Sequence, residues 1–333
     1  MSEAQSMSML SGALVWDNVW PVDQKGGPKI GNDWSKLERF RKAGYDVIGI
    51  TLAGDNQNIS QAIEMVGWAR RAIRERAENC LLVDKLEDIE AARRAQKLAV
   101  VFQFEGTRCF ERNLDMIEVF YALGVRQTIL AFNNANSAGG GCADPVDGGL
   151  TPFGARLVSE MQAVGMLIDL SHTGCRTSLD AMAMAQKPMI FSHSNPRRVH
   201  DSFRNVTDEQ IRACAATGGL IGISGASAYL GDQTCATTTL FKHLDYIVQM
   251  VGPEHAGIGL DTVFDATELN AYCRARPDEW PMTKDPNWSG FNYALPEQLV
   301  ELTALMARNG YPESAIRQIL GENYVRIAGR VWT

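Results

Sequence analysis

The sequence lacks several features that would point to a membrane or a polyanionic partner. No apolar run reaches the length needed to span a bilayer, and no long basic cluster occurs. The net charge of −7 and the pI of about 5.4 argue against nucleic acid as a partner. A basic start, typical of secretory signal peptides, is missing from the N-terminus, MSEAQSMSMLSGALVW. We therefore expect a cytoplasmic protein that binds neither membrane nor nucleic acid.

Two further absences bear on covalent structure and on fold. The seven cysteines are odd in number and scattered, with no CxxC pair, so reduced thiols are favoured over a disulfide framework. No glycine-rich phosphate loop follows an early strand, because Gly139-Gly140-Gly141 falls in a predicted loop. This weighs against a doubly wound open sheet with a dinucleotide site.

Short apolar runs alternate with helical segments along the whole chain of 333 residues. Strands are predicted at 13–16, 46–52, 81–83, 98–104, 126–132, 166–170, 189–191, 219–224 and 255–260. Helices are predicted at 34–43, 59–78, 86–95, 114–123, 153–164, 176–185, 208–216, 240–251, 296–308 and 313–321. With no linker between them, these elements predict one domain over 1–333, an α/β fold of the (β/α)₈ TIM barrel type.

Two predicted loops are long, 133–151 and 262–295. The second contains Trp280, Trp288, Phe291 and Tyr293 together with several prolines. Loops of this length in a compact domain are usually functional or disordered. The aromatic content favours an ordered lid over the barrel mouth, and a packing flap or dimer contact is the alternative.

Histidines stand at the ends of two neighbouring predicted strands. The stretch GMLIDLSHTGCRTSLDAMAMAQKPMIFSHSN has the pattern strand, helix, strand, with His172 after the first strand and His193 after the second. Parallel strands end at the same edge of a sheet, so the two imidazoles should lie side by side. A lone histidine is more often structural, but a matched pair favours a metal or catalytic site.

Two acids occupy equivalent places. Glu105 ends the strand 98–104, and Asp261 follows the strand 255–260. Two imidazoles and two carboxylates suit zinc or a similar divalent ion, which would activate water, while a free carboxylate takes a proton. Each acid alone could equally be a buried ion-pair partner. Arg204, beside Asn205, follows the His193 strand and could bind a substrate carboxylate, or be a solvated loop residue.

Together these residues resemble the membrane (renal) dipeptidase family, peptidase family M19, which are metallopeptidases of the amidohydrolase type. The matching stretches are FEG (104–106), FYALGVRQTIL (120–130), GGLTPFG (148–154), GMLIDLSH, PMIFSHSN, RNVTDEQIRACAATGGLIGI (204–223), GIGLD (257–261) and ILGENYVRI (319–327). The resemblance implies a metal-dependent (β/α)₈ barrel, usually dimeric, that cleaves dipeptides or related small amides.

The resemblance also implies roles for single residues. Glu105 would bridge two metals, and His172 and His193 would bind the second. Asp261 would serve the first metal and carry a proton. The substrate-binding residues would be the carboxylate-holding Arg204 with its neighbour Asn205, and Phe132, which stands where the family often has a histidine that polarises the scissile carbonyl.

The N-terminal strand departs from the family pattern, Asp-x-His-x-Asp. Asp17 is kept, but Val19 and Pro21 stand where two ligands of the first metal are expected, and neither side chain can coordinate a metal. In a regular strand these three positions share one face. We therefore expect one metal per chain, held by Glu105, His172 and His193.

The sequence favours a metal-dependent hydrolase of the dipeptidase type acting on a small carboxylate-bearing amide, as a homodimer. Two alternatives remain open at this stage. One keeps the barrel and the metal but changes the reaction to another hydrolysis, or to a lyase step on a small metabolite. The other is a non-catalytic binding protein.

Overall fold

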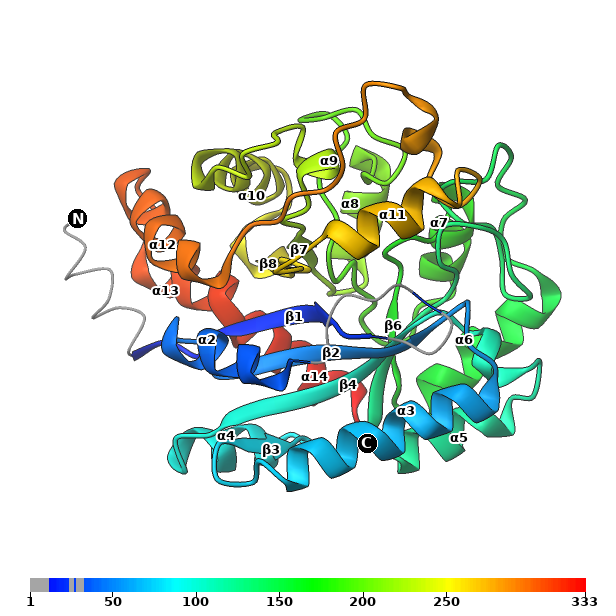
Figure 1. Ribbon diagram of the computed structural model, residues 1–333, viewed down its shortest axis with the longest axis horizontal. Helices are drawn as coiled ribbons and strands as arrows, with labels where there is room; N and C mark the ends of the chain where they lie inside the picture. Colours follow the sequence, from blue (N-terminus) through cyan, green and yellow to red (C-terminus); the bar gives the residue numbers. More distant parts are fainter. Residues whose placement is uncertain (1–11, 24–26, 28–32) are drawn as a thin grey trace.

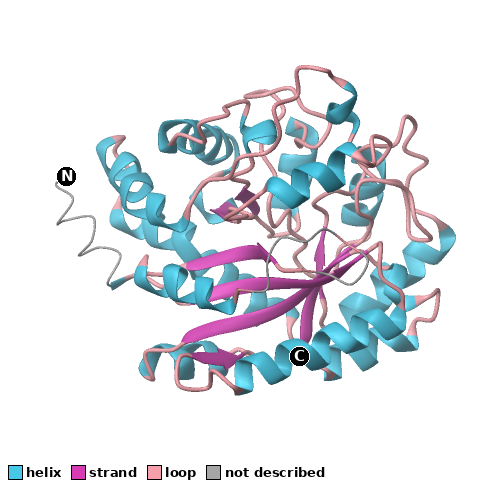
Figure 2. Cartoon of the chain, viewed as in Figure 1, coloured by secondary structure: helices cyan, strands magenta, loops and turns pink. Residues whose placement is uncertain are grey.

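The computed structural model describes residues 12–23, 27 and 33–333. Part of the N-terminal stretch considered for a signal peptide, residues 1–11, lies outside them. Parallel strands form the centre of the molecule and helices surround them (Figures 1 and 2). The strands are β1 Trp16–Pro21, β2 Val47–Gly54, β3 Cys80–Leu82, β4 Leu98–Glu105, β5 Val125–Ile129, β6 Leu167–Asp169, β7 Ile221–Ile223 and β8 Ala256–Ile258.

The strands run in the order β6-β5-β4-β2-β1-β8-β7, and β3 pairs with β4 outside this path. The sheet closes through two isolated parallel bridges, Asp169 to Ile190 and Phe191 to Ile221. These bridges connect β6 to β7 and make residues 190–191 the eighth position of the barrel. The predicted (β/α)₈ barrel is therefore confirmed, with β3 as an outer addition.

The helices follow the predicted alternation. The α-helices are α2 Leu37–Lys42, α3 Ile59–Arg74, α4 Glu87–Arg94, α5 Asp115–Ala122, α6 Pro152–Val164, α7 Cys175–Ala183, α8 Asp208–Ala216, α9 Ser227–Leu230, α10 Thr237–Val251, α11 Thr267–Arg274, α12 Leu299–Arg308, α13 Glu313–Arg317 and α14 Asn323–Val331. Short 3₁₀ segments are η1 Trp34–Lys36, η2 Arg108–Phe110, η3 Pro253–His255, η4 Pro281–Lys284 and η5 Pro296–Gln298, and η6 Gln318–Glu322 is a π turn.

Local sequence explains where several helices begin. Asn58 and Gln61 form a reciprocal capping box at α3, and Thr207 with Gln210 does the same at α8. Thr151 caps α6 directly before a proline at its first position. No helix in the described part of the chain is long and apolar enough to cross a membrane.

The prediction of a strand at 189–191 is wrong in extent, because only the two bridges form there. The backbone N–H of Ser192 donates to Asp169 Oδ1 at 3.0 Å, and that of Ser171 donates to the same oxygen at 2.9 Å. The Asp169 carboxylate thus accepts the backbone N–H bonds that a longer β-ladder would need. The strand ends early, and the chain turns toward the barrel mouth.

The last predicted helix, 313–321, was also too short. The chain continues from α13 through η6 into α14. Gly321 does not end the helix. Glycine is needed there because the backbone of Leu14 approaches closely: a Cβ at position 321 would lie 2.5 Å from the backbone oxygen of Leu14. The Tyr324 hydroxyl of α14 donates to the backbone oxygen of Ile258 at 3.0 Å, and its ring packs on Trp16. This helix therefore contacts strands of the barrel.

The first strand contains a bulge that the sequence did not predict. Asp17 pairs with Ile48, but Trp20 pairs with Ile50, so two residues of β1 stand opposite one residue of β2. The regular alternation expected for positions 17, 19 and 21 is therefore wrong. Asp17 and Val19 are fully buried, and Pro21 lines the cavity described below.

The segment 262–295 is ordered and contains α11 and η4. Its aromatic side chains form a separate apolar cluster with Tyr229 of α9 and with Phe132, which follows β5. Several of its residues line the cavity at the carboxyl ends of the strands. The segment therefore covers this end of the barrel.

Candidate functional site

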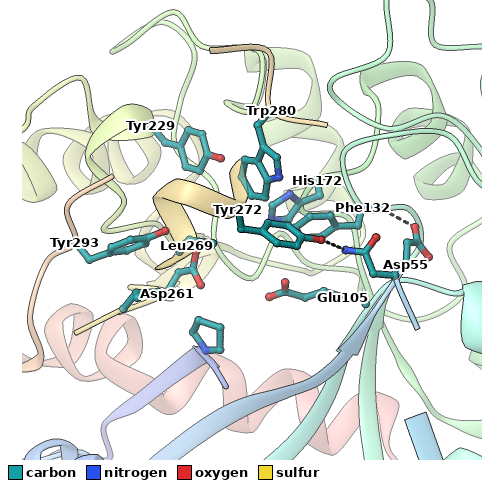
Figure 3. Close-up of a pocket in the computed structure, with 14 residues that line it drawn as sticks. Asp55, Glu105, Phe132, His172, Tyr229, Asp261, Leu269, Tyr272, Trp280 and Tyr293 are labelled. Atoms are coloured by element: carbon teal, nitrogen blue, oxygen red, sulfur yellow. Dashed lines mark hydrogen bonds between the residues drawn. The ribbon is translucent and has the colours of Figure 1, made fainter. Parts of the chain in front are cut away.

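The carboxyl ends of the barrel strands surround a cavity of about 70 Å³ (Figure 3). Glu105 is the last residue of β4, while Phe132, His172 and Asp261 follow β5, β6 and β8. Figure 3 shows Glu105 and Asp261 on one side of the cavity and Tyr229 and Trp280 on the opposite side. The barrel thus brings residues from distant parts of the chain to one mouth, as the sequence predicted.

His172 and His193 face each other, with their Nε2 atoms 2.9 Å apart. His172 Nδ1 lies 2.7 Å from Asn133 Oδ1, and the amide nitrogen of Asn133 donates to the backbone oxygen of Glu279 at 3.0 Å. The second bond fixes the amide orientation, so His172 Nδ1 carries the hydrogen and its Nε2 has a lone pair, which faces His193 Nε2. His193 Nδ1 lies 2.7 Å from the hydroxyl of Ser192. Both rings are held at Nδ1, an arrangement typical of metal-binding histidines.

Burial and charge keep both imidazoles neutral. Desolvation lowers the pKa of His172 well below its usual value, with the Arg204 guanidinium and His193 as further causes. The pKa of His193 is lowered well below its usual value by burial and by Arg204. Neutral imidazole is the form that coordinates a metal.

The two acids have the opposite tendency. Burial raises the pKa of Glu105 to about 7, although a hydrogen bond from the Thr51 hydroxyl opposes the rise. Burial and the nearby Glu105 carboxylate raise the pKa of Asp261 well above its usual range. Two carboxylates in one buried cavity repel each other, and a cation between them would relieve this repulsion.

Three residues next to the cavity have left-handed backbone conformations: Asn133 with φ 58°, His172 with φ 61° and Asp261 with φ 57°. Such conformations are uncommon for residues other than glycine and cluster at functional sites. Here they occur just beyond β5, β6 and β8.

Arg204 and Asn205 lie beside this cavity and not in it. They line a neighbouring cavity of about 170 Å³ that also touches His172. Arg204 Nη1 donates to Ser194 Oγ and Nη2 donates to the backbone oxygen of His193, both at 2.8 Å, while Nε has no partner. The amide of Asn205 donates to the backbone oxygens of His200 and Tyr229. Both terminal nitrogens of Arg204 are therefore engaged within the protein, and the side chain is buried, not solvated.

Phe132 lines the cavity and stacks on His172, with ring centroids 4.0 Å apart and planes 21° from parallel. Its backbone N–H donates to Asp55 Oδ2 at 2.9 Å. Asp55 directly follows β2, lines the same cavity, and has a pKa that burial raises to about 6. The sequence reasoning missed Asp55, although its strand-end position is the signal that identified Glu105.

The donor atoms fit a divalent cation, but they do not form a finished coordination sphere. Two ligands of a tetrahedral zinc ion would be separated by about 3.3 Å, close to the observed separation of the two Nε2 atoms. Within residues 12–23, 27 and 33–333, however, no three His, Cys, Asp or Glu side chains are arranged to hold an ion. Glu105 and the histidine pair would form a three-ligand site only after side-chain movement.

Known proteins resemble this chain over most of its length. The family model described as membrane dipeptidase (peptidase family M19) matches residues 50–271. A curated protein of Klebsiella pneumoniae, named an uncharacterized protein in the pqqA 5′ region, is 31% identical over 256 residues, covering 74% of this chain and 86% of that protein. An uncharacterized dipeptidase of Schizosaccharomyces pombe is 29% identical over 214 residues, covering 61% of this chain and 51% of that protein.

A solved structure agrees over the whole chain. The crystal structure of an amidohydrolase from Pseudomonas aeruginosa superposes with a TM-score of 0.88 at 25% identity and covers 100% of this chain and 99% of that one. The family match includes Glu105, both histidines and Asp261, which the barrel places at one mouth. The chain therefore belongs to the membrane dipeptidase family, peptidase family M19, and is a metal-dependent hydrolase of the dipeptidase type.

Proposed function

We propose that the protein hydrolyses a dipeptide or a related small amide that carries a carboxylate, with one zinc or similar divalent ion per chain. The observation that carries the proposal is the histidine pair, with facing Nε2 atoms and both Nδ1 atoms engaged. Neutral imidazoles oriented in this way serve as metal ligands.

His172, His193 and Glu105 would hold the ion. Three protein ligands leave positions open for water and substrate, which is the pattern of a catalytic site. A bound divalent cation would acidify water and polarise a carbonyl oxygen. A second ion would retain only Asp261 and a share of Glu105, because Val19 is apolar and the side chain of Pro21, which lines the cavity, has no donor atom.

Asp261 would take the proton from the attacking water and pass it to the leaving amine. Its carboxylate lies in the cavity with Glu105, where burial raises its pKa and a bound cation would favour the ionised form that accepts a proton. A raised pKa makes a carboxylate a better proton acceptor near neutral pH. The role therefore requires no further base.

Arg204 would neutralise the substrate carboxylate from the neighbouring cavity. Its buried Nε–H has no partner, whereas its terminal nitrogens already hold Ser194 and the backbone of His193. Asn205 fixes the loop that carries Arg204 through its bonds to backbone oxygens. The contact would thus be a single charge-assisted hydrogen bond.

The segment 262–295 would act as a lid. Binding cavities for small ligands usually have about 300–1,000 Å³. The cavity under the segment has about 70 Å³, so a dipeptide requires the lid to move. Hydrogen exchange with and without a bound dipeptide would show protection of α11 on binding, and no change would argue for a packing role. The proposal includes a cytoplasmic location and a homodimer. Light scattering tests the dimer.

The function itself is tested by metal-dependent turnover of a dipeptide panel. We expect hydrolysis that a chelator abolishes and that one equivalent of metal restores. Turnover of no dipeptide by the metal-loaded protein would contradict the proposal.

A further inference from the structure

The wall of the cavity opposite the acids contains a buried hydrogen-bond donor without a partner. Trp280 lines the cavity and is 8% exposed, and its indole Nε1 is buried without a partner. Trp34, Trp288 and Trp332 also have buried, unpartnered indole nitrogens in the described chain, but none of them lines this cavity. A buried N–H without an acceptor calls for an explanation, and for Trp280 its place at the site supplies one.

When the segment 262–295 is closed, packing and hydrogen bonds hold Trp280 in this place. Its ring packs edge-on against Phe132 and against Phe291, with centroids 5.8 Å apart in both cases. Its backbone oxygen accepts bonds from Thr283 N and Oγ1 at 2.9 and 2.8 Å. The preceding backbone oxygen, of Glu279, accepts the bond from Asn133 that also fixes His172. The indole is therefore positioned relative to the histidine pair.

Two tyrosine hydroxyls also line the cavity. The hydroxyl of Tyr229 is buried without a partner, and that of Tyr272 accepts a bond from Asn56 at 2.8 Å and keeps its own hydrogen. Trp280 differs from both because its ring packs on Phe132, which in turn stacks on His172. Figure 3 shows Trp280 near Phe132 and His172 and across the cavity from Glu105 and Asp261. A substrate bound between these two sides would have Glu105 and Asp261 on one side and the indole of Trp280 on the other.

We propose that Trp280 is a catalytic residue that donates its indole N–H to the oxygen of the scissile amide. The inference rests on the proposed function. Water adds to the carbonyl carbon, the C=O π pair moves to the oxygen, and the water's proton goes to Asp261. The C–N bond then breaks as that proton passes to the amine. Trp280 keeps its proton throughout and stabilises the charge that develops on the oxygen.

The test compares Trp280→Phe with Trp34→Phe on the dipeptide that the wild type hydrolyses best. Both indoles pack edge-on against aromatic rings and both have an unpartnered Nε1, but Trp34 lies outside the lid segment and does not line the cavity. Trp280→Phe keeps an aromatic ring and loses only the donor and part of the ring. We expect its kcat to fall roughly 100-fold with little change in KM or Tm, as for the loss of one oxyanion donor, and Trp34→Phe to match the wild type.

A second measurement uses a phosphinate dipeptide mimic, whose tetrahedral oxygens resemble the hydrated amide. Calorimetry should show that Trp280→Phe binds this mimic more weakly than the wild type does, by about the factor by which kcat falls. A kcat equal to that of Trp34→Phe, or a change confined to KM, overturns the role of Trp280. If the wild type neither hydrolysed dipeptides nor bound the phosphinate, the proposed function itself would be contradicted, and not only the role of Trp280.

Discussion

Asn133 connects the histidine pair to the lid, and its removal should weaken metal binding without unfolding the protein. Its Oδ1 accepts from His172 Nδ1 at 2.7 Å and its amide donates to the backbone oxygen of Glu279 at 3.0 Å. Without this acceptor, His172 can rotate or adopt the tautomer with hydrogen on Nε2, which does not coordinate.

The variant of choice is Asn133→Gly. The backbone at this position has φ 58°, which glycine adopts without strain, so the change removes the side chain and spares the backbone. Loss of an outer hydrogen bond to a metal-binding histidine typically costs 10–100-fold in affinity, or about 1.4–2.7 kcal/mol. We expect a Kd for zinc weaker by that factor.

Competition with a chromophoric chelator measures this Kd, and Asn134→Ala provides the control. The Asn134 amide donates to the backbone oxygen of Asp278 at 3.2 Å, so the control also loses a tie to the lid segment but leaves His172 untouched. If Asn133→Gly bound zinc as tightly as Asn134→Ala, the proposed orientation of His172 would be refuted.

Three further predictions follow from single side chains. Arg204→Lys keeps the charge but shifts the donors, so KM for a dipeptide should rise roughly tenfold while kcat changes less; unchanged steady-state kinetics would remove Arg204 from substrate binding. Asp261→Asn should retain the metal, shown by elemental analysis, and lower kcat by roughly 10²–10⁴-fold; full activity would exclude Asp261 as the proton carrier. Burial raises the pKa of Asp17 from 3.8 to about 7. Between these pH values the native state binds more protons than the unfolded state. The free energy of unfolding should therefore fall as the pH rises from about 4 to 7. Burial also raises the pKa of Glu105, Asp55 and Asp261, so some of the loss should remain in Asp17→Asn. Urea titrations of the metal-free protein should show a loss that is smaller in Asp17→Asn than in the wild type by on the order of 4 kcal/mol; equal pH profiles would contradict the assignment.

Much of the fold was predictable because strand and helix periodicity depends on local sequence. β2 and β4 are buried along their whole length, and their apolar runs identified them. Glu105 and the two histidines could be placed at one mouth because parallel strands end together. Asp55 carries the same strand-end signal and could have been found in the same way.

Other features depend on contacts between distant segments and have no local signal. The bulge in β1 reflects its pairing with β2, and the short bridge at 190–191 reflects the carboxylate of Asp169 taking the neighbouring N–H groups. The part played by Asn133 depends on a left-handed turn and on its contact with Glu279, 146 residues away. The position of Trp280 over the cavity depends on that same contact.

Metal stoichiometry measured together with turnover tests the account most directly. Elemental analysis of the dialysed wild-type protein should give one divalent ion per chain. His193→Ala should give none and should hydrolyse no dipeptide, because it lacks one of the two facing Nε2 atoms. Two tightly bound ions per chain in the wild type would contradict the single-metal site. Undiminished dipeptide turnover by the metal-free protein would contradict metal-dependent hydrolysis altogether.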